Sequence, residues 1–496
     1  MYPDLDSVKK IAAETGAKRI PVCREMYSDR YTAVEVTRTL RAASRHCFLL
    51  ESADQNENWG RYSFLGFDPS LELTCSNGHV RIRKILPDSS ECTEEMTVSH
   101  PKDVIRKIID EHKTPQIEGM PYFTGGLVGY FSYDYIKYSE PRLRLEDHGE
   151  SDFRDMDLML FDRVAAFDHF RQKIILICGV DTADIEKSYA AAEKSLADLA
   201  ALIKNGPKKE FEPLKITGSI TPQFDRERYA EMIRRAKHYI KEGDIFQVVL
   251  SNPLRADAEG SLFDTYRVLR ATNPSPYMFY FSSDDIEIAG ASPETLVKLE
   301  NKNLSTFPLA GTRPRGATRE EDIALEKDLL SDEKELAEHN MLVDLGRNDL
   351  GKISKFGTVK VVNLHTIERF SHVMHIGSKV KGEIAENFDA LDAISAVLPA
   401  GTLSGAPKIR ACQIIGELEG KKRGIYGGAI GYIDFTGNMD TCIAIRLTFK
   451  KNGQIFVRSS AGIVADSVPE NEYRECINKA AAVVNAVRDS EGGIDG

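Results

Sequence analysis

Residues 426–459 read YGGAIGYIDFTGNMDTCIAIRLTFKKNGQIFVRS, and their pattern decides the fold class. Apolar and polar residues alternate in three runs, at 426–435, 442–450 and 454–459, which is typical of strands. The turns between the runs contain Gly and Asn, the residues that tight connections between neighbouring strands favour. This stretch therefore predicts antiparallel strand pairing.

Working outward, the rest of the chain mixes strands with helices and shows neither a βαβ pattern nor an internal repeat. Further strands are predicted at 61–67, 80–85, 164–167, 173–178, 246–252, 277–281, 287–290, 296–300 and 373–380. Helices are predicted at 33–43, 102–112, 181–204, 226–242, 262–272, 319–345, 390–397, 406–419 and 470–486. The fold class that follows is α+β.

A segment rich in Pro, Gly and Lys, NGPKKEFEPLKITGSITP at 205–222, lacks sustained periodicity and is interpreted as a linker. It divides the chain into an N-terminal domain at 1–205, a linker at 206–224 and a C-terminal domain at 225–496. With 496 residues, of which 42% are hydrophobic, the chain is long enough for two such domains.

Charge and apolar content argue against several classes of partner. The net charge is −11 and basic residues are scattered, which disfavours nucleic acid or an anionic membrane. No apolar run approaches the roughly 20 residues of a membrane-spanning helix, and the N-terminus lacks a secretory apolar segment. Eight cysteines lie far apart without metal-finger spacing, which indicates reduced thiols in a cytoplasmic protein.

Two Glu-x-x-Glu pairs, Glu335/Glu338 and Glu472/Glu475, each lie inside a predicted helix. Residues three apart share one helix face, so each helix can present two carboxylates to one point. If the two helices face each other, the four carboxylates form an all-oxygen site suited to Mg²⁺. A di-iron site needs Glu-x-x-His on paired helices, which neither pair supplies. Taken alone, either pair is more typical of a solvated helix surface.

Further segments carry groups suited to a ligand. His375 lies in a predicted strand and faces either a pocket or the core. Arg446, which alternates with apolar residues, can hold a carboxylate or close a buried ion pair. GTLSGAPK at 401–408 offers free N–H groups to an anion, and the small residues at 459–467 let a ligand approach the backbone.

These segments together resemble the chorismate-utilising enzymes, and among them anthranilate synthase component I, over nearly the whole chain. The resemblance rests on the ordered motifs FLLESAD (48–54), RYSFLG (61–66), GGLVGYFSYD (125–134), EGDIFQVVLS (242–251), NPSPYMFY (273–280), GASPETL (290–296), PLAGTRPRG (308–316), AEHNMLVDLGRNDLG (337–351), VMH (373–375), GTLSGAPK (401–408), YGGAIGY (426–432), DTCIAIR (440–446), AGIVADSVPENEYRE (461–475) and NK (478–479). The implied fold is α+β and anthranilate synthase component I-like, with antiparallel sheets, helices on the outside, and two domains.

The resemblance implies that Glu338 and Glu475 bind Mg²⁺ directly, with Glu335 and Glu472 in support. It also implies that the ion holds the ring carboxylate of chorismate. This is physically reasonable, because four carboxylates would repel a dianionic substrate unless a divalent cation stood between them.

A role for each matching residue is implied in the same way. Glu294 corresponds to the general acid that protonates the departing C4 hydroxyl, so we expect its pKa to be raised. His375 and Thr402 correspond to the pair that serves the later elimination of pyruvate. The substrate-binding positions are Ala310, Gly311, Thr312, Tyr426, Arg446, Ala461, Gly462 and Lys479. Among them, Arg446, Tyr426 and the backbone at 461–462 resemble the clamp on the enolpyruvyl carboxylate, where Ser460 stands in place of a frequent Gly.

Two positions sort the members of this family. Relatives that add water to chorismate carry Lys where this chain has Gln247; Gln cannot activate water, so ammonia is the expected nucleophile. Relatives that make 4-amino-4-deoxychorismate carry Lys in place of Ala310, as a covalent nucleophile at C2. With Ala there, ammonia attacks C2 directly, and 2-amino-2-deoxyisochorismate then loses pyruvate to give anthranilate, the first step of tryptophan biosynthesis.

The resemblance also implies partners. None of the eight cysteines lies on a Gly-flanked elbow, so a separate glutamine amidotransferase subunit is expected to supply ammonia. The N-terminal domain would carry the allosteric and partner-contact part. Inhibition by tryptophan is implied by residues that match the family's allosteric site, namely Glu51, Ser52, Asn273, Pro274, Pro276, Tyr277, Met278 and Phe279, with Cys442 nearby. Two alternatives stay open: an aminodeoxychorismate synthase subunit, and a non-catalytic regulatory protein that binds tryptophan or chorismate.

Overall fold

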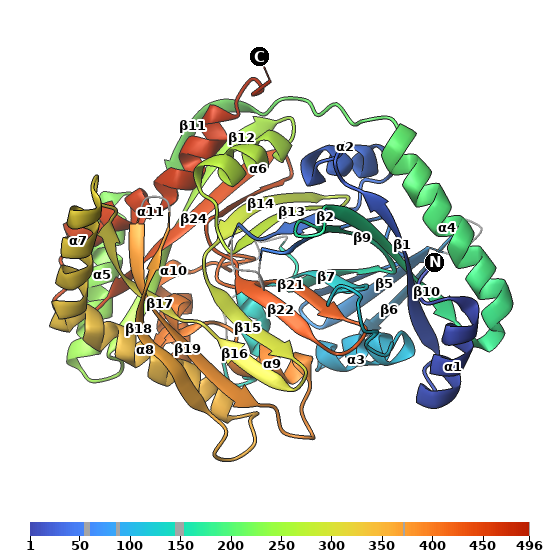
Figure 1. Cartoon of the computed structure of the whole chain (residues 1–496). Helices are drawn as coiled ribbons and strands as arrows, with labels where there is room; N and C mark the ends of the chain where they lie inside the picture. Colours follow the sequence, from blue (N-terminus) through green and yellow to red (C-terminus); the bar gives the residue numbers. More distant parts are fainter. Residues whose placement is uncertain (54–59, 86–89, 144–152, 371–372, 496) are drawn as a thin grey trace.

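The computed structural model describes residues 1–53, 60–85, 90–143, 153–370 and 373–495, and two antiparallel sheets form its centre (Figure 1). Sheet I has the spatial order β1 (Arg19–Tyr27), β10 (Lys173–Asp181), β9 (Arg163–Asp168), β3 (Tyr62–Phe67), β2 (Cys47–Glu51), β13 (Tyr277–Ser282), β14 (Ile286–Ser292), β23 (Leu447–Lys451), β24 (Gln454–Ile463), β12 (Gln247–Glu259) and β11 (Lys215–Pro222), with β20 (Gly405–Ala406) paired to β12.

Sheet II has the spatial order β17 (Leu309–Pro314), β19 (Val373–Glu383), β16 (Asn303–Thr306), β15 (Thr295–Glu300), β22 (Met439–Ile443), β21 (Ala429–Asp434), β7 (Gly126–Phe131), β8 (Met156–Phe161), β4 (Leu71–Ser76), β5 (His79–Ile85) and β6 (Glu91–Thr97), with β18 (Lys360–Arg369) paired to β19. Antiparallel pairing within residues 426–459 is confirmed, because β21 pairs with β22 and β23 pairs with β24 in antiparallel register. The single strand predicted at 442–450 is wrong, because the chain passes there from β22 in sheet II to β23 in sheet I.

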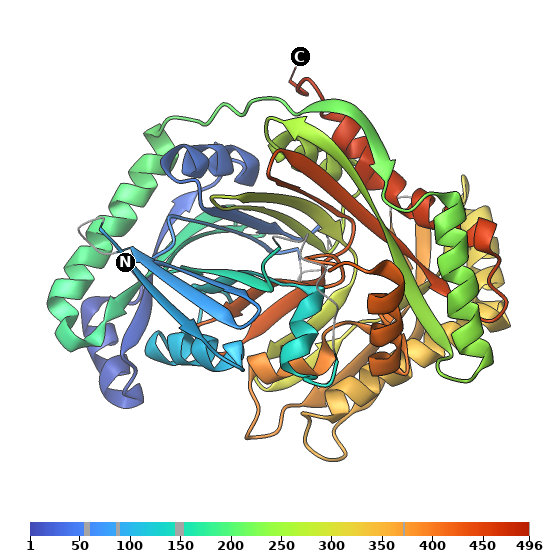
Figure 2. The same cartoon turned by 180° about the vertical axis from the view of Figure 1, so that it is seen from behind.

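Helices lie on the outside of both sheets (Figures 1 and 2). They are α1 (Leu5–Thr15), α2 (Ala33–Ala43), α3 (Pro101–Glu111), α4 (Ile185–Asn205), α5 (Arg226–Lys241), α6 (Phe263–Thr272), α7 (Arg319–Ser331), α8 (Glu333–Gly351), α9 (Ala390–Val397), α10 (Lys408–Glu419) and α11 (Pro469–Asp489), with 3₁₀ turns η1 (Tyr133–Tyr138), η2 (Thr182–Asp184) and η3 (Gly401–Leu403). No helix within the described residues is long and apolar enough to span a membrane. The predicted α+β class with outer helices is confirmed.

The two sheets face each other across a shared apolar interior. Phe48 on β2 and Phe161 on β8 both belong to this interior, and their rings meet edge to face at a centroid distance of 4.7 Å. Successive side chains of a strand point to opposite faces, so the neighbouring Leu49 joins a separate cluster under α2, α4, α6 and α11. The outer face of sheet II packs against α3, α8 and α9. Burial of each large apolar side chain contributes about 1.5–3 kcal/mol to folding.

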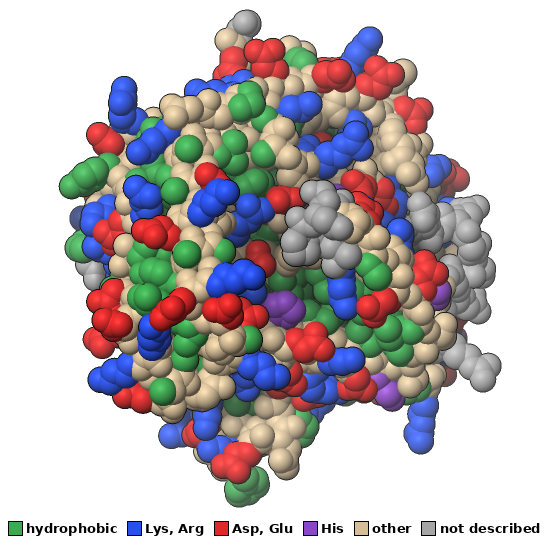
Figure 3. All heavy atoms as spheres, turned by 90° about the vertical axis from the view of Figure 1, so that its right-hand side faces the viewer, with side chains coloured by type: hydrophobic (Ala, Val, Ile, Leu, Met, Phe, Trp, Pro, Cys, Tyr) green, Lys and Arg blue, Asp and Glu red, His purple; other side chains and the backbone are tan. Residues whose placement is uncertain are grey.

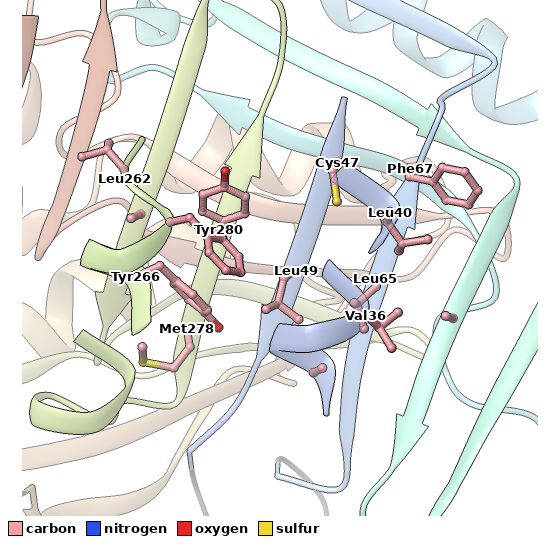
Figure 4. Packing of buried hydrophobic residues seen from close by; sticks show 14 of the residues in the cluster. Val36, Leu40, Cys47, Leu49, Leu65, Phe67, Leu262, Tyr266, Met278 and Tyr280 are labelled. Atoms are coloured by element: carbon pink, nitrogen blue, oxygen red, sulfur yellow. The ribbon is translucent and has the colours of Figure 1, made fainter. Parts of the chain in front are cut away.

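Each sheet combines strands from both halves of the chain. In sheet I, β2 pairs with β13, and in sheet II, β7 pairs with β21. Figure 4 shows the consequence for the core, where Leu40 and Leu49 lie in one cluster with Tyr266 and Met278. The division into domains at 1–205 and 225–496 stays a prediction, but neither part contains a complete sheet.

The chain between the two halves runs over the outside of the molecule, from the end of α4 to β11 (Figures 1 and 2). Residues 215–222 of the predicted linker form β11, which pairs with β12 at the edge of sheet I. Most side chains of this strand are exposed. An edge strand with so little burial lacks the apolar–polar alternation by which strands are predicted. This explains why the segment was predicted as a linker.

The helix predicted at 319–345 is two helices, α7 and α8. Asp332 separates them, because its backbone is extended with ψ 102°. Its carboxylate accepts hydrogen bonds from the backbone N–H groups of Lys334 and Glu335, at 3.1 and 3.2 Å. These bonds make Asp332 an N-cap, and α8 therefore starts with its own direction.

Candidate active site

The candidate site lies where two segments pass side by side from one sheet to the other. Between β14 and β15 the chain leaves sheet I for sheet II at Glu294, and between β22 and β23 it returns at Arg446. Backbone hydrogen bonds tie these crossings together: Ile443 N donates to Glu294 O and Ala291 N donates to Arg446 O, both at 3.0 Å. The fold thereby brings an acid and a guanidinium to one corner.

Glu294 is a buried carboxyl, with 5% of its surface exposed. Its Oε1 accepts hydrogen bonds from Leu309 N and from the Thr402 hydroxyl, both at 3.3 Å. Burial raises the pKa of Glu294 to about 8, although the two hydrogen bonds and the charge of Arg446 act in the opposite direction. At neutral pH this side chain therefore carries a proton, as a general acid requires.

His375 on β19 lies directly opposite Thr312 on β17. Its Nδ1 is 2.9 Å from the carbonyl oxygen of Gly311, and since a carbonyl only accepts, Nδ1 carries the hydrogen. The lone pair is then on Nε2, which lies 3.4 Å from Nη2 of Arg446. Burial, Arg446 and Lys479 lower the pKa of His375 to about 4. The ring is neutral at physiological pH, and Nε2 is its basic nitrogen, which accepts from Arg446 in this structure.

Arg446 adopts a left-handed backbone conformation, with φ 50°. This conformation is costly for a residue with a side chain and is found where surrounding structure imposes it, often at functional sites. Burial lowers the pKa of Arg446, and Glu294 opposes that effect. The positive charge of Arg446 thus lowers the pKa of both Glu294 and His375, and Arg446 is the charged member of these three residues.

The end of β24 forms a second wall. Ala461 and Gly462 pair with β12, and a Cβ on Gly462 would lie 2.8 Å from Nε2 of Gln247 and would displace this amide. The Gln247 Oε1 is buried and has no hydrogen-bond partner among the described residues. The Tyr426 hydroxyl donates to Ser460 Oγ at 2.8 Å. Ser460 therefore orients Tyr426, a role that a glycine there lacks.

The two Glu-x-x-Glu pairs lie on α8 and α11, and their charges affect one another. Burial raises the pKa of Glu338, and the charges of Glu335, Glu472 and Glu475 raise it further. Burial and Glu475 likewise raise the pKa of Glu472. Glu475 forms an ion pair with Lys479 at 2.7 Å. The carboxylates of α8 and α11 are therefore near enough for their charges to act on one another, and their service as one metal site stays a prediction.

This donor set has the chemistry of a site for a hard divalent cation, because it consists of carboxylate oxygens whose mutual repulsion such an ion would remove. The four carboxylates are spread more widely than a closed metal cage. Among the described residues, the group of three ligand atoms within 4.8 Å of one another is His46, Glu72 and Asp284. In that group Arg83 contacts all three side chains at 2.9–3.0 Å and already supplies the cation.

Comparison with known proteins supports this assembly. The family model described as chorismate binding enzyme matches residues 45–485. The chain belongs to this chorismate-binding family. It is 44% identical to anthranilate synthase component 1 of Acetivibrio thermocellus over 99% of both chains, and 43% identical to that of Aquifex aeolicus over 98% of both. The chain is therefore an enzyme of this family.

Solved structures agree. Anthranilate synthase component I from Streptococcus pneumoniae is 40% identical and superposes with a TM-score of 0.74, covering 85% of this chain and 92% of that one. The menaquinone-specific isochorismate synthase of Escherichia coli superposes with a TM-score of 0.68 at 18% identity, covering 97% and 98%. The second likeness shows the fold alone.

A separate cavity of about 60 Å³ in this chorismate-binding enzyme lies between β2, β13, β21 and β22. Its lining includes six of the residues predicted for tryptophan, Glu51, Ser52, Pro276, Tyr277, Met278 and Phe279, and also Cys442. Asn273 and Pro274 do not line it; Asn273 instead ends α6. Lining residues that the sequence did not single out are Leu50, Tyr62, Phe64, Tyr122, Lys298, Ile430, Gly431, Tyr432 and Asp440.

The structure pairs Thr402 with Glu294 and Arg446 with His375, and the charge of Arg446 also acts on Glu294; the sequence expectation had paired His375 with Thr402. Thr402 donates to Glu294, and the partners of the His375 ring are Thr312, Gly311 and Arg446. Sequence reasoning also missed Arg313, whose guanidinium lies 3.5 Å from Glu335. Its position beside an acidic helix depends on how β17 packs against α8, which no local pattern indicates.

Proposed function

We propose that this enzyme converts chorismate and ammonia to anthranilate and pyruvate, as the synthase subunit for the first step of tryptophan biosynthesis. The observation that carries the proposal is the buried, protonated Glu294 beside Arg446 and the neutral His375. Such a pair supplies one proton donor and one proton acceptor at the same pH. The names of the relatives support the substrate and the product.

In the first step, the nitrogen of ammonia forms a bond to C2 of chorismate. The two ring double bonds shift, the C4–O bond breaks, and Glu294 gives its proton to the leaving hydroxyl, which departs as water. The attacking nitrogen then loses one proton, which restores Glu294. Arg446 and Tyr426 would hold the enolpyruvyl carboxylate during this step.

In the second step, pyruvate leaves 2-amino-2-deoxyisochorismate. His375 Nε2 takes the proton from C2, the C3–O bond breaks with its electron pair on oxygen, and the ring becomes aromatic. The enolpyruvate accepts a proton and becomes pyruvate. The hydrogen bond from Nδ1 to Gly311 O fixes the tautomer that this role requires.

Mg²⁺ fits the site between α8 and α11, where Glu338 and Glu475 would bind it directly and Glu335 and Glu472 would support them. When bound, it supplies the positive charge that attracts the ring carboxylate of the substrate. Replacing Glu338 or Glu475 with Gln should reduce turnover about 100-fold or more, and EDTA should do the same to the unmodified enzyme. Glu333→Gln, on the first turn of α8, is the control and should retain activity and its Mg²⁺ dependence.

Ammonia rather than water is the expected nucleophile, since Gln247 is a neutral amide. The position at Ala310 carries no amine. A glutamine amidotransferase subunit would supply the ammonia in the complete assembly. The test is anthranilate fluorescence from chorismate with Mg²⁺ and either ammonium or glutamine. We expect product with ammonium alone. A non-aromatic amino product would instead indicate an aminodeoxychorismate synthase subunit, and binding without turnover would indicate a regulatory protein.

We also propose that tryptophan inhibits the enzyme by binding the cavity beside β2 and β13. In support, Glu51 is a buried wall residue of this aromatic-lined cavity, and its carboxylate is held by Arg270 at 2.8 Å and by the hydroxyls of Tyr266 and Ser63. Glu51→Gln weakens this ion pair in the cavity wall and should raise the tryptophan concentration for half inhibition about 10-fold or more. Glu25→Gln on β1 is the control. Unchanged chorismate kinetics of the parent enzyme in saturating tryptophan would refute this proposal.

A further inference from the structure

A second, larger hollow lies over sheet II, outside the active site. Its volume is about 450 Å³. Its lining comes from β15, β16 and β19 on one side and from residues 61–62 and 122 on the other, and consists of Arg61, Tyr62, Tyr122, Lys298, Glu300, Asn303, Leu304, Ser305, Lys379 and Lys381. Four of these side chains are cationic and one is acidic. On the face of the molecule in Figure 3, by contrast, basic and acidic side chains are interspersed.

Strand register sets the lysines side by side. Ser305 on β16 lies directly opposite Lys298 on β15 and, across its other edge, opposite Lys381 on β19. Lys379 is two residues before Lys381, so both point to the same face of the sheet. Lys360 on β18 lies opposite Lys381 and extends the row. Like charges at such spacing destabilise a sheet.

The local acids do not neutralise this row. Lys298 has Glu300 at 3.3 Å and Asp440 at 3.6 Å, and Arg61 has Asp168 at 2.8 Å. Within the part of the chain that the structure describes, neither Lys379 nor Lys381 has a carboxylate within 4.0 Å. Burial lowers the pKa of the half-buried Lys379, and the charges of Lys381 and Lys298 lower it further. Two ammonium groups thus face the hollow without a carboxylate in ion-pair contact, while Glu300 and Asp440 act on Lys379 from farther away.

We propose that this hollow binds a small polyanion, whose phosphate or paired carboxylate groups lie between Lys298, Lys379 and Lys381. Lysine ammonium groups bind such anions as point charges with several donors. The Ser305 hydroxyl and the Asn303 amide add neutral donors at the floor. Arg61 lies 4.9 Å above the Tyr62 ring and Lys298 lies 5.8 Å from the Tyr122 ring. These cation–π contacts fix the positions of two cations of the hollow.

This site adjoins the cavity of about 60 Å³ proposed above for tryptophan but is distinct from it. The two share Tyr62, Tyr122 and Lys298, whereas Lys379 and Lys381 line the larger hollow alone. The proposal needs neither chorismate turnover nor tryptophan inhibition, so its failure and theirs are separable. If the lysines served only the carboxylate of an amino acid in the neighbouring cavity, simple polyanions would have no effect of their own.

The test is thermal unfolding of the full chain in phosphate, in malonate, and in sodium chloride of equal ionic strength. We expect phosphate, malonate or both to raise the melting temperature of the parent by about 2 °C or more over chloride. The double variant Lys379→Gln/Lys381→Gln should lose this rise. A rise with phosphate alone assigns a phosphate group, and a rise with malonate alone assigns paired carboxylates.

Lys187→Gln/Lys194→Gln on α4, where both lysines are exposed, makes the same charge change elsewhere and should keep the full rise. In chloride alone, Lys379→Gln/Lys381→Gln should melt higher than the parent, because it removes repulsion between lysines. This second readout also shows that the variant folds. The proposal is overturned if neither anion exceeds chloride on the parent, or if the rise is the same in the Lys379/Lys381 variant.

Discussion

Burial keeps Glu294 protonated and His375 neutral over the same range of pH. A free carboxylic acid is ionised at pH 7, but burial raises the pKa of Glu294 to about 8. Histidine ordinarily titrates near neutrality, but burial and the charges of Arg446 and Lys479 lower its pKa to about 4. Between these values the acid keeps its proton and the base keeps its lone pair. The positive charge of Arg446 lowers the pKa of His375 and so favours the neutral imidazole.

The pH dependence of catalysis should report this pair. We expect kcat/KM for chorismate with saturating ammonia to be level between about pH 5 and 7 and to fall above about 8, as Glu294 loses its proton. Glu294→Gln should reduce the rate 10²–10⁴-fold, a magnitude that is about what general acids contribute, and should abolish the upper limb. An upper limb that persists in Glu294→Gln would assign the titration to another group.

The same carboxyl makes stability depend on pH. Because its pKa in the folded protein, about 8, lies above the ordinary value of 4.5, its contribution is complete below pH 4.5 and is lost as pH rises through 8. The loss should be on the order of a few kcal/mol. Glu294→Gln removes this pH-dependent contribution. From pH 6 to 9 the free energy of unfolding should therefore fall less in the variant than in the parent. Glu300→Gln is the control and should follow the parent.

At the scale of elements, Asp332 decides where the α8 carboxylates lie. Its side chain caps the helix, and the Arg313 guanidinium contacts both Asp332 and Glu335. Glu335 and Glu338 follow in the first two turns. The direction of these turns therefore depends on the cap.

Removing the cap should affect both stability and the metal. Asp332→Ala should lower the free energy of unfolding by about 1 kcal/mol and weaken Mg²⁺ binding several-fold, because the first turn of α8 frays. Thr318→Ala removes the cap of α7, where the hydroxyl accepts from Glu321 N at 3.2 Å. It should cost similar stability and leave Mg²⁺ binding unchanged. Equal Mg²⁺ affinity in both variants, measured by titration, would contradict this role of Asp332.

The sequence predicts elements whose patterns are local. The strands within 426–459 alternate cleanly, and α2 was predicted at its observed bounds of 33–43 because its apolar stripe has a helical period. The break at Asp332 is hidden, since both flanking segments are rich in good helix formers. The crossing at Arg446 is hidden as well, because the predicted strand at 442–450 runs through it. Separate strands were predicted on the two sides of Glu294, but not that they belong to different sheets. The roles at this corner followed from the family resemblance, and their geometry required the fold.

At the scale of the molecule, both sheets are built from the two halves of the chain. Five register pairs join β2 to β13 and six join β7 to β21. The cavity of about 60 Å³ lies beside these two seams, with β2 on one side and β13, β21 and β22 on the other. A ligand there would contact both halves, which is the geometry that a domain-level switch requires.

This architecture predicts that neither half folds alone, although the sequence suggests two domains. Fragments 1–205 and 225–496 would each expose an unpaired inner strand, β2 and β7 in one and β13 and β21 in the other, together with half of the core in Figure 4. Circular dichroism should show each fragment without a cooperative thermal transition, and mixing or coexpression should restore one. A full chain cleaved only between residues 206 and 212 is the matched control, because that cut leaves every strand pair intact, and it should unfold in one transition near that of the parent. A cooperative transition in isolated 225–496 would show that the C-terminal half is an independent domain after all.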